Sequence, residues 1–242
     1  MVAADGHTGA AVAGVIMNEA AVRLVTGDIS QVIEALVAAD GTAGHAHASS
    51  ARAATGRDAA LSLPDLADAA HYLCLLHGRH PGVIDHAANR SADGAARNWL
   101  VQAGAAFARE RAYLTQVAVA LGPVPSTAGQ SDCEAIVSQQ RHALDMLAQS
   151  DRRGCAMGAA MALVLDWQAV RGVLDMAAIR VGLEPYPTDL PSRAETFAMA
   201  RAIGGDSAAD RAIQFGARQL LSQQRGLWHL LKARAEVRRQ KQ

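Results

Sequence analysis

Four side chains stand where they could hold a metal ion inside a helical protein: Asp68, His71, Glu110 and Asp166. Asp68 and His71 are three residues apart, so in a helix they lie one turn apart on the same face. A carboxylate three residues before a histidine is the spacing with which helical bundles bind iron or manganese. Glu110 and Asp166 each interrupt an apolar stripe of a predicted long helix. A buried carboxylate must be paired, hydrogen-bonded, protonated or metal-bound, because burying an isolated charge is costly.

These positions also have a structural interpretation. Glu110 and Asp166 would each pair with an arginine of a neighbouring helix, such as Arg141 or Arg171, or with a hydroxyl group. Asp68 would accept a hydrogen bond from a core histidine. The residue types and spacings therefore leave two hypotheses open, a metal site and a set of structural pairs.

Histidines are densest in one short segment, which holds His71, His77, His80 and His86. Gly78 and Pro81 predict a sharp corner in the chain there. Arg79, His80 and His86 at this corner are suited to binding an anion or a partner, or else they cap helix ends. Because His71 and His77 would be about 9 Å apart along a helix axis, we predict two separate polar environments. One is an interior Asp68/His71 pair, and the other is the more exposed corner.

The elements that must position these residues are predicted to be helices. Apolar residues recur at helical spacing in almost every long segment and nowhere alternate with a period of two, which predicts an all-α protein. Capping boxes are predicted at Ser131/Glu134 and Ser192/Glu195. The predicted helices cover residues 10–39 with a break near 26–28, then 64–77, 81–89, 94–121, 131–149, 151–181, 192–203 and 207–239.

We predict two regions along the chain. Residues 1–61 form an N-terminal helical extension and a flexible linker, and residues 62–242 form a helical bundle. The segment 41–58 is rich in Gly, Ala, Ser and Thr, so His45 and His47 are expected to lie in a solvated loop.

Composition and motifs exclude several classes of function. Lys+Arg and Asp+Glu are 23 each, which argues against a broadly basic surface for nucleic acid. No compact helix-turn-helix with base-reaching side chains is evident, which disfavours a transcription regulator. The motifs of nucleotide-binding loops, nucleophile elbows and zinc proteases are absent.

Targeting and cysteine signals point to the cytoplasm. The three cysteines form no CxxC pair, which suits a reducing compartment. The apolar stretch 8–17 has no basic residue before it, and the uncharged run 154–165 is too short to span a bilayer. We therefore expect a cytoplasmic protein with no membrane or nucleic-acid partner, for which a homodimer is compatible with the sequence.

With its helix order and with Asp68-x-x-His71, Glu110 and Asp166, the region from Ser62 to Arg239 resembles the ferritin-like superfamily, specifically small bacterial proteins of that shape. The resemblance implies a ferritin-like helical bundle with extra N-terminal helices. In the di-iron members, two helices each supply a Glu and two others each supply an ExxH motif.

The chain departs from that di-iron pattern at two positions. Ala169 stands where a histidine would follow Asp166, and the last helix offers Gln224 in place of a carboxylate. The resemblance therefore implies a binding or interaction module without a complete di-iron site and without a cofactor. The alternative is an iron- or manganese-dependent oxidoreductase or hydroxylase that uses carboxylate and histidine ligands inside the bundle.

Overall fold

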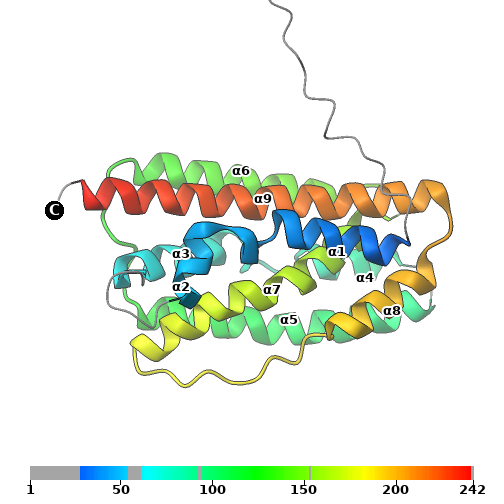
Figure 1. Cartoon of the computed structure of the whole chain (residues 1–242), viewed down its shortest axis with the longest axis horizontal. Coiled ribbons are helices and arrows are strands. Elements are labelled where there is room, and N and C mark those ends of the chain that lie inside the picture. The colour runs from blue at the N-terminus through cyan, green and yellow to red at the C-terminus, as the bar shows by residue number, and fades with distance from the viewer. Residues whose placement is uncertain (1–27, 54–60, 92–93, 153, 241–242) are drawn as a thin grey trace, which may run out of the picture.

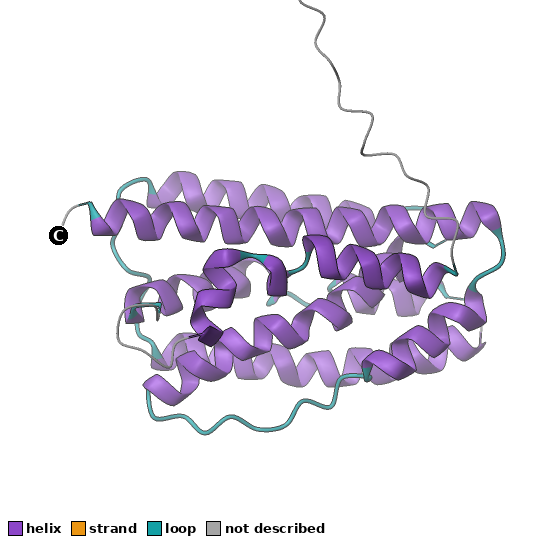
Figure 2. Cartoon of the chain, viewed as in Figure 1, coloured by secondary structure: helices purple, strands orange, loops and turns teal. Residues whose placement is uncertain are grey.

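The computed structural model describes residues 28–53, 61–91, 94–152 and 154–240, and these residues form helices and no strand (Figures 1 and 2). The predicted all-α class is confirmed. The elements are α1 (Ile29–Asp40), the short 3-10 helix η2 (Thr42–Gly44), α2 (Ala46–Ala53), α3 (Leu63–His77), α4 (Val83–Arg90), α5 (Gly94–Ala120), α6 (Gln130–Ala148), α7 (Cys155–Arg180), α8 (Arg193–Ile203) and α9 (Ser207–Arg239).

Helix α7 is the centre of the molecule, and every other helical element in the described residues contacts it. Its sequence is apolar around most of its circumference, which is typical of a helix covered on all sides. Among the described residues, α7 alone is long and apolar enough to cross a membrane, yet 83% of that stretch is buried inside the protein. Its apolar character is therefore accounted for by its place in the core.

Helix α9 packs along α7 with a heptad pattern. The buried residues alternate in steps of four and three, through Ile213, Ala217, Leu220, Gln224, Leu227, Leu231 and Arg234. This spacing keeps one face of a long helix against its neighbour over many turns. The same period fixes which face of α9 points away from the core.

Two helix starts follow from capping boxes. Ser62 with Asp65 caps α3, and the predicted box of Ser192 with Glu195 caps α8. The predicted box at Ser131 is wrong, because α6 begins one residue earlier. Gly129 adopts a left-handed conformation with φ of 75° and directly precedes that helix.

The predicted flexible linker at residues 41–58 is wrong in its described part. Residues 42–53 form η2 and α2, and both His45 and His47 are buried. Small residues let this segment lie close to α7, and Thr42 donates hydrogen bonds to Asp166. One hydrophobic core joins α1, η2 and α2 to the body, across the predicted boundary at residues 61 and 62.

The predicted N-terminal helix is described only in its last part. Helix α1 begins at Ile29, directly after the predicted break, and Asp28 caps it by accepting a hydrogen bond from the backbone N–H of Ser30. Residues 10–27 of the predicted helix lie outside the described residues.

Candidate functional site

Asp68, the first predicted metal ligand, is completely buried between α3 and α9. Both of its carboxylate oxygens accept hydrogen bonds from the guanidinium group of Arg234, at 2.9 Å each. Arg238 also donates to Asp68 and to Asp65, one turn earlier. Two arginines of α9 thus neutralise two aspartates of α3, and the oxygens of Asp68 are occupied.

His71 does not pair with Asp68, so that part of the prediction is wrong. Its Nε2 atom lies 2.7 Å from the carbonyl oxygen of Gly122, in the turn after α5. The two cationic side chains of α9 reach the Asp68 carboxylate, and charge-assisted hydrogen bonds are stronger than a bond from a neutral imidazole.

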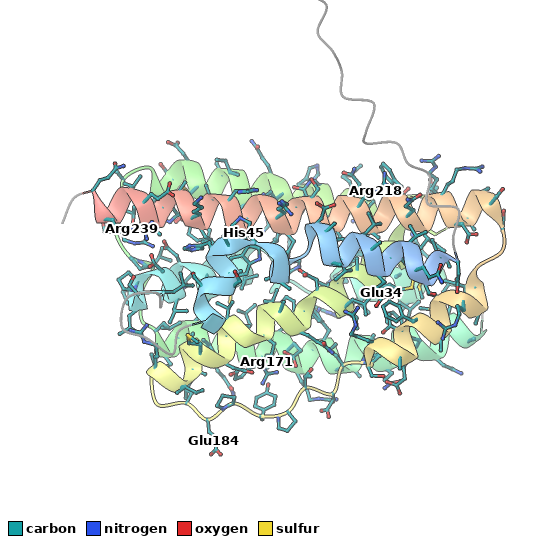
Figure 3. All side chains as sticks on the ribbon, in the orientation of Figure 1. Glu34, His45, Arg171, Glu184, Arg218 and Arg239 are labelled. Atoms are coloured by element: carbon teal, nitrogen blue, oxygen red, sulfur yellow. The ribbon has the colours of Figure 1, made fainter. Side chains whose placement is uncertain are left out.

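Glu110 forms the predicted ion pair with Arg171, whose Nη1 atom lies 2.7 and 2.9 Å from its two carboxylate oxygens. Trp167 Nε1 also donates to Glu110 at 2.9 Å. The guanidinium carbon of Arg171 lies 3.9 Å from the ring centre of Tyr113 and 4.9 Å from that of Tyr186 (Figure 3 labels Arg171). Of the two arginines named as possible partners of Glu110, the structure pairs it with Arg171.

Asp166 is buried on α7 and accepts two hydrogen bonds from Thr42, from the backbone N–H at 2.7 Å and from the hydroxyl at 2.6 Å. Trp228 Nε1 of α9 donates to the same hydroxyl at 2.9 Å. A hydroxyl group was one of the two kinds of partner, beside an arginine, that we expected for Asp166. The contact ties η2 to both central helices.

The four predicted ligands thus have separate partners in separate places. Within the described part of the chain, no group of three or more histidine, cysteine, aspartate or glutamate side chains comes together to hold a metal ion. What the arrangement provides instead is a set of cross-links between helices.

The predicted corner forms, although its members do not meet at one point. His80 is exposed, with Nδ1 3.2 Å from Asp85 Oδ2, and Arg111 Nη1 lies 3.2 Å from the same oxygen. Arg79 lines a cavity of about 20 Å³ together with His77 and Arg141. His86 lies half-buried on α4, and no hydrogen bond joins it to Arg79 or His80 among the described residues.

His77 is more enclosed than the sequence predicted. It is buried, its Nε2 atom lies 2.7 Å from Gln224 Oε1 of α9, and its ring meets Trp167 edge to face. Burial lowers the pKa of His77 to about 4, although the Gln224 hydrogen bond opposes this effect. Gln224, singled out as a missing carboxylate, thus serves as the partner of a buried neutral imidazole.

The feature that sequence reasoning missed is a row of cations along α9, one at every seventh residue. The row consists of Arg211, Arg218, Arg225, Lys232 and Arg239. Arg225 is half-buried and the other four are exposed. Figure 3 labels two members of the row, Arg218 within α9 and Arg239 at its C-terminal end. We call these five residues the α9 basic row. Their seven-residue interval can be seen in the sequence.

Few carboxylates neutralise this row. Arg225 lies 3.5 Å from Asp40 of α1, and Lys232 lies 3.9 Å from Glu236 one turn along α9. Arg211, Arg218 and Arg239 form no ion pair within the described residues. The row therefore presents more positive than negative charge to solvent, in a chain whose formal net charge is zero.

A surface hollow of about 620 Å³ opens in the middle of the α9 basic row. His229 lines this hollow, and its Nδ1 atom lies 3.2 Å from Nε2 of the buried His45. Burial lowers the pKa of His45 to about 4, and the neighbouring His229, His47, Arg225 and Lys232 lower it further. The hollow is lined on α1 by Leu36 and Asp40, and on α9 by residues that include Arg218, Arg225, Gly226 and His229.

A second hollow, of about 610 Å³, lies where α4, α7 and α9 meet near the start of α7. Its lining mixes apolar and polar side chains and includes Ser91 and Arg152. The chain continues from these two into residues 92–93 and 153, which lie outside the described residues. This hollow therefore does not define a site.

Comparisons with known proteins identify a family but no activity. No curated protein and no solved structure matches the chain. One family does match, from within α1 to the end of α9, which spans the predicted boundary between extension and bundle. The chain therefore belongs to the family of unknown function DUF6975, which matches residues 37–239.

Proposed function

We propose that this protein is a helical binding module that docks an anionic partner on the α9 basic row. The observation that carries the proposal is the recurrence of a cation at every seventh residue along one exposed ridge of a 33-residue helix. A solvated helix face needs charge, but it does not need charge of one sign in one line. A line of one sign creates a field that attracts an oppositely charged partner.

The local charge balance supports the same proposal. Among the described residues, Asp40 and Glu236 are the carboxylates within ion-pair distance of the row, and three of its five cations have none. The buried carboxylates Asp68 and Glu110 pair with other arginines. The basic row is therefore under-neutralised although the chain as a whole carries no net charge.

The ferritin-like resemblance agrees with this role, since it implied a binding module without di-iron chemistry; the ferritin-like fold itself stays a prediction. The iron- or manganese-dependent oxidoreductase was the alternative. The contacts of the described residues do not favour this alternative, because each of its four proposed ligands is hydrogen-bonded to a different residue.

The test measures binding of poly-L-glutamate by titration calorimetry at low and at high salt. We expect binding that weakens with salt, because the attraction is between exposed charges. Arg211→Gln with Arg218→Gln should reduce the affinity about tenfold, since two exposed cations contribute up to about 1 kcal/mol each.

The matched control is Arg97→Gln with Arg201→Gln. Both arginines are exposed and lie outside the row, on α5 and α8, and neither forms an ion pair within the described residues. The control removes the same net charge and should leave the affinity almost unchanged. Equal losses in both double variants would show that binding follows net charge, and the proposal would then be wrong.

A further inference from the structure

We infer that the partner of the α9 basic row is an acidic helix whose carboxylates recur at every seventh residue. This inference rests on the proposed function and adds the shape of the partner to it.

The spacing of the row is the spacing of a coiled-coil partner. Seven residues of α-helix advance about 10.5 Å, so the five cations extend over about 42 Å. A second helix with a glutamate at every seventh residue places its carboxylates at the same interval. Two helices that wind around each other with a left-handed twist keep such rows facing each other.

The row also stays at the same angle around α9 relative to the buried face of the helix. The buried seam of α9, which includes Leu220, Leu227 and Arg234, repeats at the same seven-residue interval as the cations. A straight helix would let a seven-residue row drift by about 20° per repeat, but the shared period moves seam and row together. The cations therefore follow one side of α9 from Arg211 to Arg239.

The hollow of about 620 Å³ gives a partner helix a point of close approach. Leu36 of α1 contributes apolar surface to its lining. A side chain of the partner can enter there while its carboxylates lie near Arg218 and Arg225. Asp40 and Glu236 repel carboxylates nearby, which favours a partner whose acidic residues are spaced out over one whose charge is continuous.

Other anionic surfaces fit the row less well. A duplex carries one phosphate charge per about 1.7 Å of its axis, so about 25 charges are distributed around a 42 Å length of duplex, against five cations in the row. A helix that lies on a membrane combines its cations with a continuous apolar face. Phe215 is the one exposed large apolar side chain on α9 within the described residues.

The test compares two peptides of about thirty residues with identical composition, each rich in alanine and glutamine and each with five glutamates. In the first, the glutamates recur at every seventh position. In the second, they recur at every sixth position, so each step turns by about 240° and the charges are distributed around the helix. We expect the heptad peptide to bind at least about fivefold more tightly, measured by fluorescence anisotropy.

A charge-neutral variant tests the row itself. Arg218→Gln with Gln219→Arg, and Lys232→Gln with Ala233→Lys, move two cations by about 100° around α9 without changing the net charge. These positions are exposed or half-buried, and circular dichroism verifies that the fold is retained. The preference for the heptad peptide should disappear while poly-L-glutamate still binds.

The outcomes separate the two proposals. Equal binding of both peptides, or poly-L-glutamate binding without peptide binding, would overturn the acidic helix and leave the anionic partner standing. Tighter binding to a DNA duplex or to phosphatidylserine vesicles than to the heptad peptide would also overturn the acidic helix. Failure of every anionic probe would overturn the proposed function itself.

Discussion

Gly158 of α7 lies directly against the backbone of Ile213 of α9, and a Cβ atom on Gly158 would be 1.9 Å from the carbonyl oxygen of Ile213. The contact is reciprocal, because a Cβ atom on Gly216 would be 2.0 Å from the carbonyl oxygen of Cys155. Non-bonded heavy atoms cannot lie this close together, so a Cβ atom at either position would push the two helices apart. The two glycines therefore set the distance between the central helices, and with it the position of the α9 basic row.

Alanine at either glycine should destabilise the protein strongly. Because the obstructing atoms belong to the backbone, the helices must separate, and we expect Gly158→Ala and Gly216→Ala each to cost about 3 kcal/mol or more. Urea unfolding measures this cost. Gly104→Ala on α5 is the control, since its Cβ would meet only ordinary contacts at 3.7 Å or beyond. It should stabilise the helix by about 0.5–1 kcal/mol, and equal losses at all three positions would contradict the close-approach argument.

The helices were largely predictable because the apolar spacing and the capping residues act locally. The Glu110–Arg171 pair was also predictable, because a carboxylate on an apolar stripe needs a cation on a neighbouring helix. The partners of Asp68 were not, because Arg234 and Arg238 lie more than 160 residues away in the sequence. His45 and His47 were misplaced because a Gly- and Ser-containing segment was read as solvated, whereas its small residues let it pack.

The candidate site was missed for a different reason. The interval of seven between Arg211, Arg218, Arg225, Lys232 and Arg239 is visible in the sequence. Its significance depends on which face of α9 is covered, and that is set by packing against α7. The charge of the whole chain, which is zero, conceals a local excess because few carboxylates lie next to the row.

Replacing Glu110 with leucine should cost about 3–5 kcal/mol, because the buried Arg171 loses one of its two carboxylate partners and Trp167 Nε1 loses its acceptor. Arg171→Met should also destabilise, since Arg171 additionally donates to Asp175 at 2.7 Å. The double variant should lose less than the sum of the two single losses, because the unpaired charge is then gone. Chemical denaturation of all four proteins gives the coupling energy, and strict additivity would show that the pair is not coupled.

Asp68 should act as a structural carboxylate and not as a metal ligand. Asp68→Asn weakens two charge-assisted contacts to α9 and should lower the free energy of unfolding by about 3 kcal/mol. Because Arg234 and Arg238 occupy the carboxylate, the loss should be the same with added iron, with added manganese and with a chelator. Thermal unfolding in these three conditions checks this, and a metal-dependent stabilisation that only Asp68→Asn or His71→Ala abolishes would restore the metal-site hypothesis.

His77 should make the protein less stable in mild acid. Its pKa is lowered to about 4 in the folded protein, against an ordinary value of 6.5, because burial disfavours the charged imidazole. The unfolded chain therefore binds a proton first as the pH falls. The contribution of His77 is fully present above about pH 6.5 and is lost progressively between about pH 6.5 and pH 4, by about 3 kcal/mol in total.

Urea unfolding at intervals between about pH 4.5 and pH 7.5 tests this dependence. His77→Gln removes the titrating ring while leaving a polar side chain beside Gln224, so its stability should depend less steeply on pH than that of the wild type. Other buried groups, His45 and His47 among them, keep a residual slope in the variant because burial lowers their pKa values as well. His142→Gln, an exposed change on α6, should retain the wild-type slope. The contrary outcome is an equal loss of stability with falling pH in His77→Gln and in the wild type. The pKa of His77 would then be the same in the folded and unfolded states, and the buried neutral imidazole beside Gln224 would be wrong.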